Sequence, residues 1–96
     1  MNHMAIIKLV DSRGDADYIV HEVENRADAD LLVCKVASRG EALRDDQYWC
    51  FVESRGEASS NIYLHDSRAG ADLLICYVNS RGEAGWRVEH ALKGQL

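Results

Sequence analysis

The stretch Ser12-Arg13-Gly14-Asp15-Ala16 decides the fold, because five further versions of it follow along the chain. The other copies occupy residues 25–29, 38–42, 54–58, 67–71 and 80–84. Successive arginines of the six copies are 13, 13, 16, 13 and 13 residues apart, and one offset of 42 maps the first three copies onto the last three. We therefore predict six short repeats in two pseudo-equivalent halves, over residues 5–42 and 47–87, with a linker at 43–46 and a tail at 88–96.

The composition is that of one small globular domain. Of the 96 residues, 47% are apolar and 28% are charged, so the chain can bury a core without metal or disulfides. Its net charge of −5 argues against binding to nucleic-acid phosphates. No apolar run reaches the ~18–20 residues of a membrane span, and three cysteines without C-x-x-C spacing indicate reduced thiols. We expect a soluble, cytoplasmic monomer without nucleic-acid or membrane partners.

A strand-length run precedes each copy of the motif. The period is too short for the common helical-pair repeats, which need more than ~30 residues, but it fits one strand and a tight connection. Alternate residues of a strand point to opposite faces, and one face is apolar in all six runs. That face carries Ile7, Val20, Val33, Trp49, Ile62 and Ile75. The opposite face carries Val10, Val23, Val36, Val52, His65 and Val78. We therefore predict strands that are covered on both sides.

The motif itself has the spacing of a helix start. Ser12 and Asp15 are three residues apart, as are the equivalent residues of four other copies, which is the spacing of a capping box. Because little chain remains before the next strand, we predict a β-rich α+β domain with short capped helical turns. Gly70 replaces the acid of the fifth copy, where we expect a different turn. The alanine that ends every copy predicts close packing, and residues 86–93, followed by Gly94, predict a short closing helix.

Short signatures around the motif resemble those of a known family. They are Val-Asp before the loop, as at Val10-Asp11, Ala-Asp-Leu after it, as at 29–31, and a closing Ala-Gly-Trp-Arg at 84–87. The chain is similar in these respects, from about Ala5 to Arg87, to a family of small uncharacterised bacterial repeat proteins built of strand-plus-loop units. The resemblance implies a deeply knotted chain with a seven-crossing torus knot. No enzymatic activity or ligand comes with the resemblance, so it indicates a fold and not a function.

The motif arginines are the candidate binding residues: Arg13, Arg26, Arg39, Arg55, Arg68 and Arg81. Guanidinium groups bind carboxylate and phosphate through paired hydrogen bonds, and helix N-termini favour anions, so these loops suggest an anion site. The alternative is that each arginine pairs with an acid of its own or a neighbouring loop. The excess of 16 acidic over 11 basic residues favours this alternative.

Four residues with metal-binding side chains stand five residues before a motif arginine: His21, Cys34, Cys50 and Cys76. Three thiols and an imidazole are a zinc ligand set in type, but the paired cysteine spacing of zinc sites is missing. Because small thiols behave as apolar residues when buried, we favour core packing and predict no metal site. His65 beside Asp66 resembles a proton-transfer pair. No nucleophile lies near it in the sequence, so a partly exposed strand-end histidine is the favoured interpretation.

The chain carries no common catalytic or nucleotide-binding motif, such as a P-loop, G-x-S-x-G or H-E-x-x-H. We therefore expect no catalytic residue and no cofactor. The leading hypothesis is a non-enzymatic structural or interaction module, because the uniform repetition indicates packing rather than one chemically distinct position. The alternative is a protein that binds small anions or an acidic partner through the loop arginines.

Overall fold

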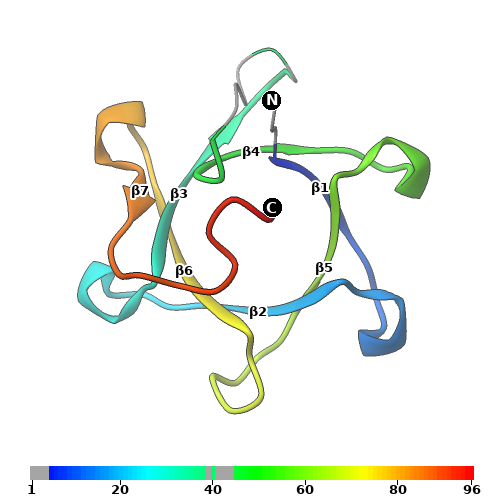
Figure 1. Cartoon of the computed structure of the whole chain (residues 1–96), viewed down its shortest axis with the longest axis horizontal. Helices are drawn as coiled ribbons and strands as arrows, with labels where there is room; N and C mark the ends of the chain where they lie inside the picture. The colour runs from blue at the N-terminus through cyan, green and yellow to red at the C-terminus, as the bar shows by residue number, and fades with distance from the viewer. Residues whose placement is uncertain (1–4, 39, 41–44) are drawn as a thin grey trace.

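Seven short strands and four single helical turns form the part of the chain described by the computed structural model, residues 5–38, 40 and 45–96 (Figure 1). The strands are β1 (Ala5–Leu9), β2 (Tyr18–Glu22), β3 (Leu31–Val36), β4 (Tyr48–Phe51), β5 (Ser60–Leu64), β6 (Leu73–Val78) and β7 (Gly85–Trp86). The 3-10 helices are η1 (Arg13–Asp15), η2 (Arg26–Asp28), η3 (Arg55–Glu57) and η4 (Arg81–Glu83). The six strand-length runs of the sequence are thus strands, and the domain is strand-rich.

The first six strands close into a barrel. Their order around it is β4, β1, β5, β2, β6 and β3, and β3 pairs with β4 to complete the ring. All six of these pairings are parallel, whereas β7 pairs antiparallel with β3. Strands β1–β3 therefore alternate around the ring with strands β4–β6. Figure 1 shows the ring end-on, with the connections projecting outward.

Staggering of the strands lets short connections join strands that run in the same direction. Ile62 of β5 pairs both with Leu9, at the end of β1, and with Tyr18, at the start of β2. Because β2 begins level with the end of β1, the connection at residues 10–17 only has to step across β5. A connection between parallel strands usually needs a dozen or more residues, because it returns along the strand. The stagger removes that return and explains the short repeat.

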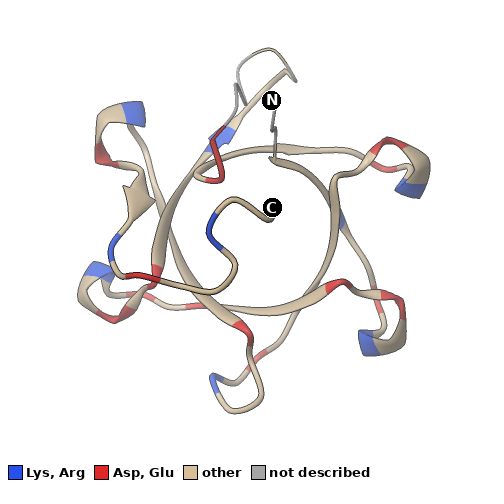
Figure 2. Ribbon diagram, viewed as in Figure 1, with Lys and Arg blue, Asp and Glu red and all other residues tan. Residues whose placement is uncertain are grey.

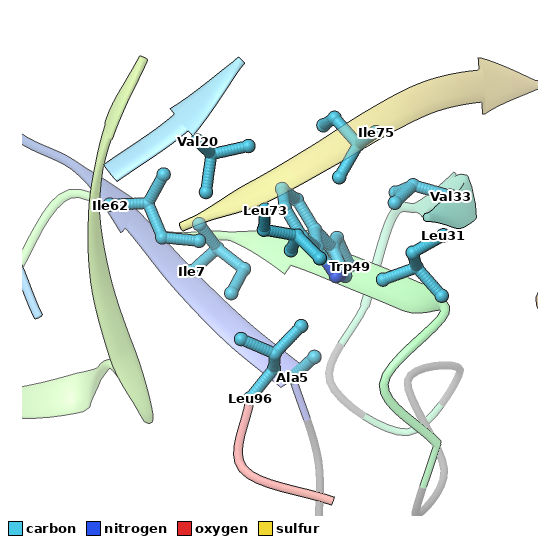
Figure 3. Close-up of a cluster of buried hydrophobic side chains, with 10 residues drawn as sticks. All are labelled: Ala5, Ile7, Val20, Leu31, Val33, Trp49, Ile62, Leu73, Ile75 and Leu96. Carbon is cyan, nitrogen blue, oxygen red and sulfur yellow. The ribbon is translucent and has the colours of Figure 1, made fainter. Parts of the chain in front are cut away.

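The face predicted to be apolar in every strand points into the barrel (Figure 3). Its six members are all fully buried: Ile7, Val20, Val33, Trp49, Ile62 and Ile75. The same interior cluster contains Ala5, Leu31, Leu73 and Leu96. Full burial of a large apolar side chain contributes roughly 1.5–3 kcal/mol. The barrel interior is therefore the main source of stability.

The outer face of the strands is covered in part by the connections. Val23 and Val78 are buried there, whereas Val10, Val36, Val52 and His65 are half-buried. One outer cluster contains Ile6 and Cys50, and another contains Val23, Ala29 and Cys76. Covering on both sides, as predicted, is thus complete at some positions and partial at others.

The described turns are held mainly by backbone hydrogen bonds. Ser12 Oγ accepts from the backbone N–H of Gly14 at 3.1 Å, but Asn25, Ser54 and Ser80 make no side-chain cap bond. The predicted capping boxes are therefore wrong at those three positions, and Ser12 accepts from the residue two positions on rather than from Asp15, three positions on. A three-residue 3-10 turn closes through bonds to the residue three positions back, such as Ala29 N–H to the Arg26 carbonyl at 3.1 Å. No helix in the described residues is long and apolar enough to cross a membrane.

The motif alanines differ in burial. Ala29 is only 2% exposed, Ala42 lies outside the described residues, and the others are half-buried: Ala16, Ala58, Ala71 and Ala84. The prediction of close packing therefore applies most strongly to Ala29, which lies against Val23 and Cys76.

Ala29→Leu is expected to lower the free energy of unfolding by about 1–3 kcal/mol, because the larger side chain overpacks a filled site. Ala27 belongs to the same turn but is exposed, so Ala27→Leu is a matched control with an expected change within about 0.5 kcal/mol. Equilibrium denaturation measures both variants. If Ala29→Leu and Ala27→Leu had the same free energy of unfolding, close packing at Ala29 would be contradicted.

The closing helix predicted for residues 86–93 is absent, and residues 91–94 form a turn in which Gly94 has φ 83°. Trp86 belongs to β7, where it pairs with Leu31, and its Nε1–H donates to Asp46 Oδ2 at 2.9 Å. These contacts with the barrel outweigh the local helix preference. The tail then curves across the ring, and Leu96 enters the barrel interior (Figure 1).

Candidate functional site

The motif arginines are spread around the barrel rather than gathered at one point. Figure 2 shows Lys or Arg at the outer ends of the connections, besides other basic residues on the strands and in the tail. The arginines within the described residues are all exposed: Arg13, Arg26, Arg55, Arg68 and Arg81. Arg39 lies outside the described residues. Each arginine must therefore be considered with the connection beside it, and not as part of one common site.

Arg26 forms an ion pair with the acid of another copy of the motif. Its Nη2 lies 2.6 Å from Glu83 Oε1, and the two side chains are 52% and 46% exposed. The two connections are neighbours because each follows one of the paired strands β2 and β6. An exposed ion pair contributes about 0–1 kcal/mol, so this one orients the connections more than it stabilises the barrel. It matches the alternative in which motif arginines meet acids of neighbouring loops.

Two other arginines also contact main chain or a ring close by. Arg55 Nη2 donates to the carbonyl oxygen of Asp15 at 3.2 Å, which joins the connections after β4 and β1. The Arg81 guanidinium lies 5.0 Å from the centroid of the Tyr48 ring, and the Tyr48 hydroxyl donates to the Arg81 carbonyl at 3.3 Å. These guanidinium groups are exposed but are positioned by other parts of the chain.

The connection after β5 differs from the others because Gly70 replaces the acid. Gly70 has φ 84°, which favours glycine, and no 3-10 helix forms at residues 66–70. Arg13 reaches this connection, with its Nη2 3.0 Å from His65 Nε2 and 3.5 Å from the place of a Cβ on Gly70. His65 Nδ1 lies 3.6 Å from Asp66 Oδ1. Where Arg26 meets a carboxylate, Arg13 therefore meets an imidazole.

The cysteines and His21 do not converge on one point. All three cysteines are buried, but Cys50 packs with Ile6 in one outer cluster, and Cys76 packs with Val23 in another. His21 Nδ1 lies 2.9 Å from the His65 carbonyl oxygen. Among the described residues, no three potential metal ligands lie together. Equivalent positions of the repeat thus face different places around the barrel.

Tyr77 is a partly buried titratable side chain that packs against the core rather than in a site. Burial, with a smaller effect of the Glu22 carboxylate, raises the pKa of Tyr77 from 10.0 to about 12. Its ring packs edge-on to Trp49 at 6.4 Å, and Lys35 Nζ lies 4.2 Å from its centroid. A phenol with this pKa is a poor general acid or base near neutral pH.

The residue after the motif alanine binds a neighbouring strand at two points. The Asp17 N–H donates to the Asn61 carbonyl at 2.7 Å, and Asp17 Oδ2 accepts from the Asn61 N–H at 2.8 Å. The same pair of bonds joins Asp30 to Leu74, Ser59 to Ile6 and Asp72 to Ile19. The side-chain oxygen thus replaces a strand carbonyl. The repeated Ala-Asp signature was the sequence signal for this role, which spacing alone did not reveal.

Asp17→Ala is expected to cost about 1–2 kcal/mol of stability, because the Asn61 N–H loses a charged acceptor. Asp15→Ala is the matched control, since the carboxylate of Asp15 is exposed and only its backbone carbonyl accepts from Arg55. Urea denaturation, together with hydrogen exchange of the Asn61 amide, measures the effect. A loss as large in the control as in Asp17→Ala would argue that the two-point contact has no special role.

The sequence of the chain matches a known family of knotted domains. A comparison with protein families matches residues 4–87 to the 7(1) septoil knot domain. The chain belongs to this family. Septoil knot domains are small domains with a seven-crossing knot and no established function, as the sequence resemblance implied. The match covers all six copies of the motif, whereas residues 88–96 lie beyond it. Searches of curated proteins and of solved structures found no match.

Proposed function

We propose that this septoil knot domain is a non-enzymatic structural or interaction module. The observation that carries the proposal is the filling of the barrel by ten buried apolar side chains, centred on residues such as Ile7, Trp49 and Ile75. Barrels that bind small molecules keep part of this interior open for the ligand. The module acts in this proposal as a cytoplasmic monomer, and the net charge of −5 supports a role without nucleic acid.

The repeated motif serves, in this proposal, to interlock two equivalent halves. Residues 5–42 and 47–87 each supply three barrel strands, and the two sets alternate around the ring. The two-point contacts support the same arrangement, because Asp17 binds Asn61 and Asp72 binds Ile19 across the halves. Connections that pass around strands of the other half prevent either half from being withdrawn. Such an interlocked barrel is suited to holding its surface loops in fixed relative positions.

A second candidate function is the binding of a small anion or an acidic partner at the connection after β5. The observation that favours it is the contact of Arg13 with His65, where Gly70 takes the place of an acid. A carboxylate or phosphate group near Arg13 would supply the negative charge that Glu83 supplies to Arg26. In its broader form, the hypothesis holds that all the motif arginines bind anions. The set then includes Arg13 and Arg26 together with Arg39, Arg55, Arg68 and Arg81.

Titration with citrate and inorganic phosphate, followed by backbone-amide NMR, distinguishes the two functions. The structural module predicts no saturable shift at the motif connections with millimolar ligand, relative to chloride at equal ionic strength. A saturable shift that is lost in Arg13→Gln but kept in Arg26→Gln would establish the anion site instead. Arg26→Gln is the matched control because Arg26 is already neutralised by Glu83.

A further inference from the structure

Residues 94–96 fill one end of the barrel. This is the end where the strands begin, near Ala5 of β1 and Ser60 of β5. The Leu96 side chain is fully buried and belongs to the interior cluster, beside Ala5 (Figure 3). The preceding residues Lys93, Gly94 and Gln95 remain exposed. Leu96 is therefore the fully buried anchor of the segment, and Leu92, two residues before Gly94, packs against the same cluster while only partly buried.

The backbone of this segment is held from two sides. On one side, the hydroxyl groups of Ser59 and Ser60 donate to the Leu96 carbonyl oxygen at 2.5 and 3.0 Å. On the other side, the Asp46 carboxylate accepts from the N–H of Gly94 at 2.5 Å and from the N–H of Leu96 at 3.3 Å. The barrel thus binds two N–H donors and a carbonyl acceptor of a backbone that leaves the turn at residues 91–94, and not only an apolar side chain.

The two most buried polar residues that bind the segment are Asp46 and Ser60. Burying their polar groups without a hydrogen-bond partner would destabilise the fold. Asp46 and Ser60 are 5% and 1% exposed, and they are the buried polar residues of the described part of the chain. Ser60 occupies the repeat position that is leucine at Leu31 and Leu73. A hydroxyl or carboxylate in such surroundings costs free energy unless it is hydrogen-bonded. Ser60 therefore has the properties of a buried donor to a peptide carbonyl, and Asp46, which also accepts from Trp86 Nε1 at 2.9 Å, binds the N–H groups of the segment as well.

The site and its occupant belong to different parts of the chain. Asp46, Ser59 and Ser60 lie within the residues that match the septoil knot family, whereas residues 94–96 lie beyond the match. We propose that this end of the barrel is a peptide-binding site, filled here by the chain's own tail. Its ligand is a short segment with glycine two positions before an apolar residue. The proposal rests on the interaction role within the proposed function, and it names the partner of that role as a peptide.

The test uses the full chain with Leu96→Ser, which removes the anchor and leaves the barrel residues unchanged. The probe is the peptide Ala-Leu-Lys-Gly-Gln-Leu, which has the sequence of residues 91–96, as free acid and as amide. We expect saturable shifts of the Ser60 and Ile7 amides, and no saturable shift with the same peptide ending in serine. In the unmodified chain the apparent affinity should be at least about tenfold weaker, because the tethered tail competes at high effective concentration.

A second substitution separates this site from binding elsewhere. Adding Ser60→Ala to Leu96→Ser should weaken the peptide about tenfold through loss of one hydrogen bond to a buried carbonyl. Equal affinity for the leucine- and serine-ended peptides, or no shift at millimolar peptide, would overturn the proposal. If Leu96→Ser is unfolded alone, recovery of the folded spectrum on adding the leucine peptide supports the site, and failure to recover contradicts it. Cleavage of the peptide, checked by mass spectrometry, would instead overturn the non-enzymatic function.

Discussion

Replacing Trp49 by alanine is expected to lower the free energy of unfolding by about 3–5 kcal/mol. Trp49 is the largest of the fully buried side chains. It lies on β4, which pairs with β1 and β3 and so closes the ring. Domains of this size are stable by only about 5–15 kcal/mol. The substitution therefore removes a large share of the total and should leave the barrel marginally folded.

The expected loss has two physical components. The indole packs edge-on to Phe51 at 6.1 Å and to Tyr77 at 6.4 Å, so its removal opens a cavity among aromatic rings. Its Nε1–H donates to the Asp46 carbonyl oxygen at 2.6 Å, and this buried hydrogen bond is lost. Trp49→Phe retains most of the ring volume and loses the hydrogen bond. We expect it to cost about 1–2 kcal/mol, mainly through that bond.

Far-ultraviolet circular dichroism during denaturation suits this comparison, because the substitution removes one of the two tryptophans and so changes the fluorescence signal itself. Unfolding and refolding must give the same curve, since a knotted chain equilibrates only when it can rethread. If Trp49→Ala lowered the free energy of unfolding by less than about 1 kcal/mol, the neighbouring side chains would have closed the cavity. Trp49 would then not be the main stabilising residue of β4. The alanine and phenylalanine variants together measure the cavity separately from the hydrogen bond.

The barrel interior could be predicted from the sequence because its signal is local. Alternation within five- or six-residue strands places Ile7, Val33 and Ile62 on one face, whatever strand lies beside them. The turn positions were equally visible, since the motif repeats its glycine and serine. The capping bonds could not be predicted in the same way, because Ser54 and Ser80 make no side-chain cap bond in their three-residue 3-10 turns.

The arrangement of the strands could not be predicted, because it depends on contacts between distant residues. Nothing near Ile62 indicates that it pairs with both Leu9 and Tyr18. The resulting stagger overrides the usual expectation that parallel strands need long connections. The sequence likewise predicted that Arg26 would pair with an acid of its own or a neighbouring loop, but it did not indicate which acid. Glu83 becomes its neighbour only when β2 and β6 pair.

The conformation of the tail could not be predicted for a different reason, because the tail lies outside the repeat. Its local sequence suggests a helix, but Trp86 is drawn into β7 and Leu96 into the barrel. Asp46, assigned from sequence only to a charged linker, is the residue that fixes both. Its carboxylate accepts from Trp86 Nε1 at 2.9 Å, besides the two N–H groups of the tail. A charged residue in a linker gives no sign of such a role before the fold is known.

Asp46→Ala is the second substitution with a large expected effect, a loss of about 2–4 kcal/mol. The reason is the removal of one buried carboxylate that serves three donors, each of which costs about 1–3 kcal/mol if left unsatisfied. Gly94 is an exposed residue, so its N–H can bond to water once the carboxylate is gone, and the three losses do not add in full. Asp45→Ala is the matched control, because Asp45 is the adjacent residue and is exposed. We expect the control to change stability by less than about 0.5 kcal/mol.

Hydrogen exchange tells whether Asp46 holds the whole barrel or only the tail. If the tail is a separable occupant of the barrel end, Asp46→Ala should accelerate exchange at the Leu96 N–H much more than at the Ile75 N–H within β6. This result is expected because the bonds to residues 94–96 are made by the side chain, whereas the Asp46 carbonyl still accepts from Trp49. Equal acceleration at both amides would mean that tail and barrel open together. In that case the tail is part of the cooperative core, and the barrel end is not a site that another peptide can enter.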